Sequence, residues 1–221
     1  MPLTDRVALI TGAGNGIGRA VAQAYAAAGA TSLLLGRRRE NLATTYDLIT
    51  AAAGKAVIVP IDLENELHAV PDLVAAVYQR FGRLDILVNN AAEFGLMTPL
   101  SAYDPVLWEK VLRVNLTAPF FLTRELLPLL QRSEKAFVIN VICEVARHPS
   151  AYWGAYGISK AALLSMSHIW AQELAHTNVS IHTIDVAATA TKLRKKAYPA
   201  EENPTLLTPE QAALAFVDLV R

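Results

Sequence analysis

A glycine-rich loop at the start of the chain constrains its fold more than any other feature. The apolar run 6–11 leads into Thr11-Gly12-Ala13-Gly14-Asn15-Gly16-Ile17-Gly18, after which a helical pattern continues to Ala28. In such a strand–loop–helix unit, Gly12 permits the tight turn, Gly16 lets the backbone approach a pyrophosphate, and Gly18 allows close helix–strand packing. The start of the helix adds amide groups and a positive dipole end. The sequence therefore predicts a dinucleotide site, and the strand–loop–helix order argues against a glycine turn without a ligand.

The remaining chain alternates strand-like and helix-like segments. We expect strands at 6–11, 31–35, 56–61, 85–89, 136–141 and 179–186. We expect helices at 16–28, 39–53, 66–81, 104–130 and 152–176, and one from Thr208-Pro209-Glu210 to the end, with Pro119 and Pro128 bending or ending the fourth. This alternation predicts an α/β fold, a doubly wound parallel sheet of six or seven strands with helices on both faces. A length of 221 residues suits one Rossmann-type domain over 1–221.

Charge and cysteine content narrow the classes of partner. The chain has 20 basic and 20 acidic residues, and its basic residues do not cluster beyond Arg37-Arg38-Arg39, which argues against nucleic acid or a membrane surface as the main partner. Cys143 is the only cysteine, so an intrachain disulfide is excluded, and no CxxC or His-rich run predicts a metal site. We find no apolar stretch of membrane-spanning length, and residues 1–6 lack the apolar region of a signal peptide. The expected location is the cytoplasm.

A second motif, Tyr156-Gly157-Ile158-Ser159-Lys160, lies in the predicted helix 152–176. Residues four apart in a helix stack on one face, so the phenol of Tyr156 and the ammonium of Lys160 should be neighbours. A phenol has a reference pKa of about 10, and a nearby cation favours its ionised form. The pair could therefore transfer a proton opposite a bound nicotinamide.

Taken together, these motifs resemble the short-chain dehydrogenase/reductase family over nearly the whole chain. The glycine loop is similar to the family's TGxxxGxG motif, and Asn89-Asn90-Ala91-Ala92 is similar to its NNAG segment. Asn115 lies in a Val-Asn-Leu context like the family's structural and catalytic asparagine, and Tyr156/Lys160 match YxxxK. The seventh strand and glycine-rich tail usual in the family are absent, so the sequence is either a short member or part of a longer chain.

The resemblance implies a nicotinamide cofactor, and the end of the second strand favours NADP(H) over NAD(H). An NAD site usually has an acidic residue there, whereas an arginine accommodates a 2′-phosphate. Here the strand ends Leu35-Gly36-Arg37-Arg38, with no acidic residue before Glu40, although the arginines could also be a solvated helix start. Asp62 matches the acid that contacts the adenine amino group in this family, but a turn cap for Asn65-Glu66 is an open alternative. The expected cofactor-binding residues are Gly12, Gly14, Asn15, Gly16, Ile17, Gly18, Arg37, Asp62, Leu63, Asn89, Ala91, Tyr156, Lys160 and Thr191.

By the same resemblance, the catalytic residues are Tyr156, Lys160, Asn115 and Cys143. Tyr156 would be the general acid in carbonyl reduction and the base in alcohol oxidation. Lys160 would hold the nicotinamide ribose and lower the pKa of Tyr156. Asn115 would kink its helix and support a water that relays protons to Lys160. The implied reaction is hydride transfer between NADP(H) and a small carbonyl or alcohol compound.

Two departures from the family pattern lie near the reacting end of the expected cofactor. The run Asn140-Val141-Ile142-Cys143 places a cysteine where the family has a serine, and a thiol is a weaker hydrogen-bond donor and acceptor than a hydroxyl. The family's Asn-Pro-Gly is Asp185-Val186-Ala187 here, although Thr191 is retained. The alternative to an enzyme is therefore a nucleotide-binding protein with little turnover that acts as a redox sensor or interaction partner.

We expect the substrate walls at 92–100 and 187–207, outside the carboxyl ends of the strands. Candidate substrate contacts are Glu93, Phe94, Met97, Glu144, Trp153, Lys192 and Tyr198. The two long helices, about 104–130 and 152–176, are similar to the family's dimer surface, which implies a homodimer or homotetramer. Their Leu, Ala and Trp content is equally compatible with an ordinary core.

Overall fold

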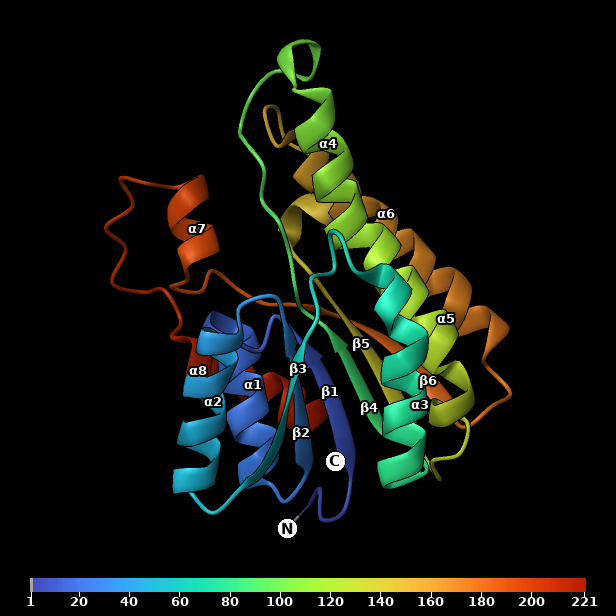
Figure 1. Cartoon of the computed structure of the whole chain (residues 1–221). Helices are drawn as coiled ribbons and strands as arrows, with labels where there is room; N and C mark the ends of the chain where they lie inside the picture. The colour runs from blue at the N-terminus through green and yellow to red at the C-terminus, as the bar shows by residue number, and fades with distance from the viewer. Residues whose placement is uncertain (1) are drawn as a thin grey trace.

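The computed structural model describes residues 2–221 and contains one six-stranded parallel sheet between two layers of helices (Figure 1). The strands are β1 (Val7–Thr11), β2 (Thr31–Gly36), β3 (Lys55–Pro60), β4 (Ile86–Asn89), β5 (Ala136–Ile142) and β6 (Val179–Asp185). Their order is β3-β2-β1-β4-β5-β6, with every neighbouring pair parallel. This is the doubly wound order of a Rossmann fold, so the fold class predicted from the sequence is confirmed with six strands.

The helices follow the expected alternation. They are α1 (Gly16–Ala27), α2 (Arg39–Ala51), α3 (Val70–Phe81), α4 (Pro105–Leu112), α5 (Ala118–Leu130), α6 (Gly154–Glu173), α7 (Lys192–Ala197) and α8 (Pro209–Leu219). Short 3₁₀ turns occupy Leu67–Ala69, Leu100–Ala102 and Glu144–Ala146. Figure 1 shows α1, α2 and α8 on one face of the sheet and α3, α5 and α6 on the other. No helix within residues 2–221 combines the length and the apolar character needed to cross a bilayer.

The central strand β1 explains how the sheet is held between the two helical layers. All five of its residues are buried, and successive side chains point to opposite faces. Ala8 and Ile10 belong to the apolar cluster that includes α1 and α8, whereas Val7 and Leu9 belong to the cluster that includes α3 and α5. Burying one such aliphatic side chain contributes about 1.5–3 kcal/mol, so a strand apolar on both faces fixes both layers.

The predicted helix 104–130 is interrupted, but not by proline. A π-helical turn, Arg113–Thr117, joins α4 to α5 and contains Asn115. Pro119 is the second residue of α5, directly after this turn, and Pro128 lies inside α5. The wider hydrogen-bonded turn at Asn115, a feature often found at functional sites, is therefore the interruption.

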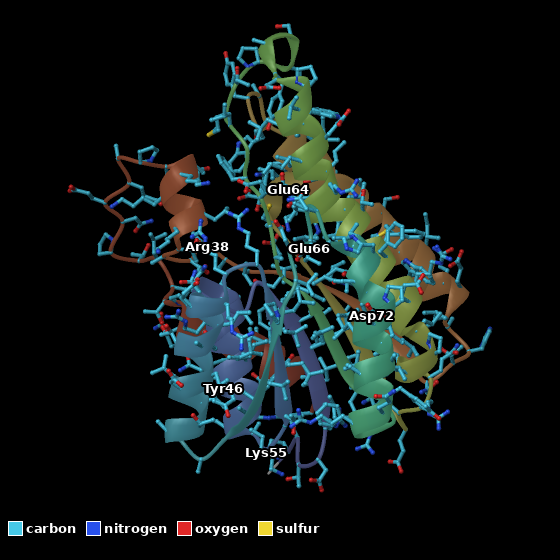
Figure 2. All side chains as sticks on the ribbon, in the orientation of Figure 1. Arg38, Tyr46, Lys55, Glu64, Glu66 and Asp72 are labelled. Carbon is cyan, nitrogen blue, oxygen red and sulfur yellow. The ribbon has the colours of Figure 1, made fainter. Side chains whose placement is uncertain are left out.

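The carboxyl ends of the strands form the functional edge of the sheet. Figure 2 shows Arg38 and Glu64, which follow β2 and β3, at the opposite end of the sheet from Lys55, the first residue of β3. The strand order changes direction between β1 and β4, and ligands of open α/β sheets bind in the crevice at this point. Helix α7, which the sequence did not predict, lies beyond this edge (Figure 1).

Candidate active site

A cavity of about 760 Å³ opens at the carboxyl ends of the strands. Its wall runs from the glycine loop and the end of β2 to the side chains of Tyr156 and Lys160 on α6. Segment 90–93 and the residues after β6, including α7, complete the wall. The two motifs that lie 140 residues apart in the sequence therefore line the same cavity.

The glycine loop has the shape of a phosphate cradle. Gly12 has φ +69°, and a Cβ atom there would lie 2.9 Å from Asn90 Nδ2 and 3.1 Å from Ala91 Cα. A Cβ atom on Gly14 would lie 2.9 Å from Asn41 Cβ. No side chain caps the first turn of α1, because Asn15 is the N-cap residue but makes no capping hydrogen bond. The open loop and the uncapped helix start fit a pyrophosphate.

A hydrogen-bond link holds this loop against the segment after β4. The Thr11 hydroxyl accepts from the backbone amides of Asn90 and Ala91 at 2.9 Å each, and donates to the Val88 carbonyl at 3.2 Å. Asn90 Nδ2 donates to the Thr11 carbonyl at 2.9 Å. Asn90 thus shapes the cavity wall, whereas the sequence analysis named its neighbour Asn89 as a cofactor-binding residue.

The side chain of Asn89 lies in the core rather than in the cavity. It is 2% exposed and donates to Asn140 Oδ1 at 2.8 Å. Gly18 also lies behind the cavity wall, since a Cβ atom there would collide with the Gly12 carbonyl and Asn90 Nδ2. That crowding agrees with the close helix–strand packing expected of Gly18. Three other expected cofactor-binding residues, Ile17, Leu63 and Ala91, line the cavity.

The end of β2 presents guanidinium groups to the cavity. Arg37 and Arg38 both line it, and no acidic residue of β2 or its following turn does so. Arg37 Nη1 lies 4.0 Å from Glu64 Oε2, and the same carboxylate oxygen is 2.8 Å from Lys110 Nζ. Because Lys110 is the closer partner of Glu64, the Arg37 guanidinium is only loosely held.

Asp62 lines the cavity and also caps a turn. Its Oδ1 accepts from the Glu64 amide and its Oδ2 from Asn65 Nδ2, both at 3.0 Å. The turn-cap contact left open by the sequence is therefore present. It is compatible with Asp62 facing the cavity.

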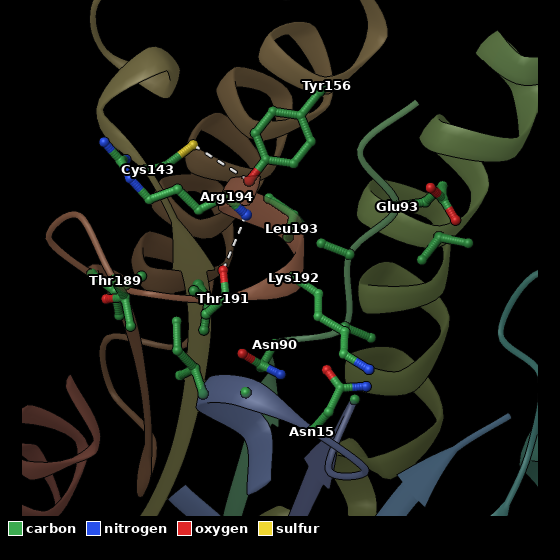
Figure 3. A pocket seen from close by; sticks show the side chains of 18 of the residues that line it. Asn15, Asn90, Glu93, Cys143, Tyr156, Thr189, Thr191, Lys192, Leu193 and Arg194 are labelled. Carbon is green, nitrogen blue, oxygen red and sulfur yellow. Dashed lines mark hydrogen bonds between the residues drawn. The ribbon is translucent and has the colours of Figure 1, made fainter. Parts of the chain in front are cut away.

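Tyr156 and Cys143 meet at the far end of the cavity (Figure 3). Cys143 Sγ lies 3.7 Å from the Tyr156 hydroxyl oxygen, and the tyrosine is 6% exposed. Burial raises the pKa of the Tyr156 phenol well above its ordinary value, and the neighbouring Cys143 and Asp185 raise it further. Burial likewise raises the pKa of the Cys143 thiol.

Lys160 lies one helical turn after Tyr156, but its ammonium is directed at a backbone carbonyl of β5 rather than at the phenol oxygen. Its Nζ donates to the Val141 carbonyl at 2.7 Å and lies 5.7 Å from the centre of the Tyr156 ring. The side chain is 2% exposed, and burial lowers its pKa from 10.5 to about 8. We expected Lys160 to lower the pKa of Tyr156, but the pKa of the phenol is raised, chiefly by burial.

Asn115 locks the π-helical turn to two other elements. Its Oδ1 accepts from the Glu93 amide at 2.8 Å, and its Nδ2 donates to the Glu93 carbonyl and to the Ser159 hydroxyl, both at 2.9 Å. Ser159 in turn donates to the Tyr156 carbonyl at 2.7 Å. Asn115 is fully buried and holds α6 in register with the segment after β4, without lining the cavity itself.

The expected substrate wall is present in part. Glu93, Glu144, Trp153, Lys192 and Tyr198 line the cavity. Phe94 is buried behind them, with its ring centre 5.8 Å from that of Trp153 and 5.2 Å from that of Tyr156. Met97 is 41% exposed and does not line the cavity.

Helix α7 lies within the expected wall 187–207 and supplies cavity residues that the sequence analysis did not name individually. Leu193 and Arg194 line the cavity, and Arg194 makes a paired ion contact with Glu201 at 2.6 and 2.7 Å. Thr191, the N-cap of α7, accepts from the Arg194 amide at 3.1 Å (Figure 3). The capping Thr191 was the available signal for this helix. Six residues between two loops are too short for periodicity to reveal.

The fold and this arrangement define a Rossmann-type α/β protein with a tyrosine–lysine site. The sequence profile of the short chain dehydrogenase family matches residues 6–202. The uncharacterized oxidoreductase YciK of Escherichia coli (strain K12) is 35% identical over 213 residues, which cover 94% of this chain and 82% of the relative. This chain therefore belongs to the short-chain dehydrogenase/reductase family and is an oxidoreductase of that family.

Solved structures agree with this assignment. A structure from Pseudomonas syringae, assigned to the short chain dehydrogenases, is 41% identical with a TM-score of 0.95, and the match covers 99% of this chain and 90% of that one. Another, from Escherichia coli CFT073 and complexed with NADPH, is 34% identical with a TM-score of 0.93, covering 98% of this chain and 91% of that one.

Proposed function

We propose that this protein transfers a hydride between NADP(H) and a small carbonyl or alcohol compound, with Tyr156 as the general acid or base. One observation carries the proposal: the hydroxyl of Tyr156 and the glycine cradle line a single cavity. A cofactor whose pyrophosphate lies on the cradle could therefore present its reacting end to Tyr156. When bound, the nicotinamide supplies or accepts the hydride.

The phosphate preference is supported by the residues at the end of β2. Arg37 and Arg38 line the cavity, and Arg37 is only loosely held by Glu64 at 4.0 Å. A guanidinium group pairs well with a 2′-phosphate, whereas the carboxylate that would bind a 2′-hydroxyl is missing. The related Escherichia coli CFT073 structure, which is complexed with NADPH, supports the same preference.

The proposed proton chemistry follows from the burial of the site. In carbonyl reduction, Tyr156 donates its hydroxyl proton to the carbonyl oxygen of the substrate while the carbonyl carbon receives the hydride. Burial keeps the phenol protonated, which suits an acid. Lys160 stands beside it as the buried cation that stabilises the phenolate formed when the proton leaves. The reverse sequence oxidises the alcohol.

Two further residues support Tyr156. Asn115 fixes α6 through Ser159 and thereby positions the tyrosine. Cys143, with its sulfur 3.7 Å from the phenol oxygen, occupies the place of the family's serine and offers the substrate oxygen a weak donor. We expect it to orient the substrate less strongly than a hydroxyl would.

The experiment for the reaction is a screen of aldehydes, ketones and quinones with NADPH, repeated with Tyr156→Phe. The variant keeps the aromatic packing against Phe94 and Trp153 but has no proton to donate. We expect a loss of at least a hundredfold in kcat with nearly unchanged NADPH binding. Unchanged kcat in the variant would refute the role of Tyr156.

The experiment for cofactor choice is calorimetry with NADPH and NADH. Arg37→Ala should weaken NADPH binding by about tenfold, leave NADH binding nearly unchanged, and so erode the preference. Lys55→Ala is the matched control for the loss of one positive charge, because Lys55 begins β3 at the edge of the sheet opposite the cavity. Equal affinity for the two cofactors in the parent protein would contradict the proposal.

We further propose that the protein assembles as a homodimer or homotetramer through α5 and α6. Both helices carry large apolar side chains on their surfaces, with Phe120, Ile158 and Ile169 between 38% and 54% exposed. Light scattering of the parent and of Ile169→Lys tests this proposal. A monomeric parent would contradict it.

A further inference from the structure

An ion pair between Asp185 and Arg147 lies at the carboxyl end of β5 and β6, next to Cys143. Asp185 is the last residue of β6 and pairs in register with Ile142, the residue before Cys143. Its Oδ2 accepts from Arg147 Nη1 at 3.0 Å. Asp185 lines the same cavity as Cys143, Tyr156 and Lys160, whereas Arg147 lies outside it on the loop after β5. A carboxylate therefore stands where the related family has the asparagine of Asn-Pro-Gly.

We propose that Asp185 sets the electrostatic potential at Tyr156 and Cys143, and that Arg147 is the counter-ion that offsets part of the charge of this carboxylate. The pair acts on the proton chemistry through position and charge, without donating or accepting the reacting proton. The part of the inference that concerns Tyr156 rests on the proposed function. The part that concerns Cys143 does not.

The effect of the carboxylate has a definite sign. A negative charge beside a phenol or a thiol disfavours the phenolate or thiolate form. Burial is the main reason that the pKa values of Cys143 and Tyr156 are raised, and Asp185 raises both further. Burial also raises the pKa of Asp185 itself, Arg147 lowers it, and nearby Glu144 raises it. As the paired cation, Arg147 thus offsets part of the negative charge that acts on the site.

The other charged groups around Tyr156 come from α6, from α7 and its following loop, and from the segments after β4 and β5. On its own helix, Lys160 is directed at the Val141 carbonyl. From the segment after β4, Glu93 lies 3.7 Å from Lys196 of α7. Also on α7, Arg194 is paired with Glu201. The last charged groups lining this cavity near Tyr156 are Glu144, which follows Cys143, and Lys192 of α7.

Removing either partner separates this electrostatic role from a structural one. Asp185→Asn keeps the size of the side chain and removes the negative charge, so the thiolate and the phenolate should form at lower pH. Arg147→Gln removes the counter-ion and leaves the Asp185 charge uncompensated. The thiolate of Cys143 and the phenolate of Tyr156 should then form at the same pH as in the parent or at higher pH. If the ion pair only braced the loop, both variants would loosen it and change the site in the same direction.

The single cysteine of this chain reports the potential directly. Alkylation of Cys143 by iodoacetamide, measured from pH 7 to 10.5 on the protein without cofactor or substrate, gives the pH midpoint of thiolate formation. We expect Asp185→Asn to lower this midpoint by about half a pH unit to one pH unit, and Arg147→Gln to raise it or leave it unchanged. Arg147→Lys, which keeps the charge, should match the parent.

A lowered midpoint in both charge-removing variants, or an unchanged midpoint in Asp185→Asn, would overturn the inference. Because alkylation requires no turnover, that failure is distinct from failure of the proposed reaction. Once a substrate is found, the pH profile of alcohol oxidation gives a second readout. The limb on which the rate rises with pH reports formation of the Tyr156 phenolate and should move to lower pH in Asp185→Asn. An unmoved limb would overturn the part of the inference that concerns Tyr156.

Discussion

Replacing Lys160 with methionine should abolish activity and yet not destabilise the protein at neutral pH. Lys160 is 2% exposed, and its pKa falls from 10.5 to about 8 on burial. At about 1.4 kcal/mol per pH unit, this fall means that the buried ammonium costs the fold roughly 3 kcal/mol at pH 7. Methionine has a similar length and removes that cost. The variant also leaves the Val141 carbonyl without its 2.7 Å hydrogen-bond donor, and this loss destabilises it by about 1–3 kcal/mol.

The stability difference between the parent and Lys160→Met should also depend on pH, which makes the prediction more specific. The folded-state pKa is lower than the unfolded one, so between pH 8 and 10.5 the unfolded chain binds more protons and the parent gains stability as the pH rises. Below pH 8 both states are protonated, and the full cost of the buried charge is present. From pH 7 to pH 9 the parent should therefore gain roughly 1–1.5 kcal/mol relative to Lys160→Met.

Urea unfolding followed by tryptophan fluorescence at pH 7, 8 and 9, without cofactor, measures this difference. The matched control is Lys55→Met, because Lys55 is an exposed lysine at the start of β3. Its difference from the parent should stay within about 0.5 kcal/mol at every pH. A Lys160→Met variant that is at least 2 kcal/mol less stable than the parent at pH 7, or a difference that does not change with pH, would refute the reasoning.

Two other substitutions test the supports of Tyr156. Cys143→Ser places a stronger hydrogen-bond donor beside the phenol, so we expect kcat for carbonyl reduction to rise about tenfold or more. A lower kcat in the variant would mean that the thiol itself is adapted to catalysis. Asn115→Ala removes the amide that binds Glu93 and Ser159, and should lower the free energy of unfolding by about 2–3 kcal/mol in urea titrations. Unaltered stability of Asn115→Ala would show that these buried bonds do not hold the π-helical turn.

Local signals in the sequence were sufficient to predict the fold. The strand–glycine loop–helix start and the alternation of elements predicted the doubly wound parallel sheet, because a strand of such a buried sheet is apolar on both faces. The π-helical turn was only partly predictable. The π-helical turn contains Asn115, where a kink was expected, whereas the two prolines that suggested a break lie within α5.

The parts of the site that a local sequence motif defines could be predicted. Contacts between residues far apart in the sequence could not. The loop and the Tyr156–Lys160 spacing identified two walls of one cavity. The direction of the Lys160 ammonium and the net pKa of Tyr156 depend on burial and on the Val141 carbonyl, which no local pattern encodes. The Asp185–Arg147 pair, 38 residues apart, likewise needed the register of β5 with β6.

The most direct test of the proposed chemistry follows a labelled hydride. Carbonyl compounds that the screen identifies as substrates are incubated with NADPH that carries deuterium at the transferable position, and the product alcohol is analysed by mass spectrometry. We predict one deuterium atom in the product with the parent protein and none detectable with Tyr156→Phe in the same time. An alcohol without deuterium, or equal labelling by the two proteins at equal rates, would contradict hydride transfer assisted by Tyr156.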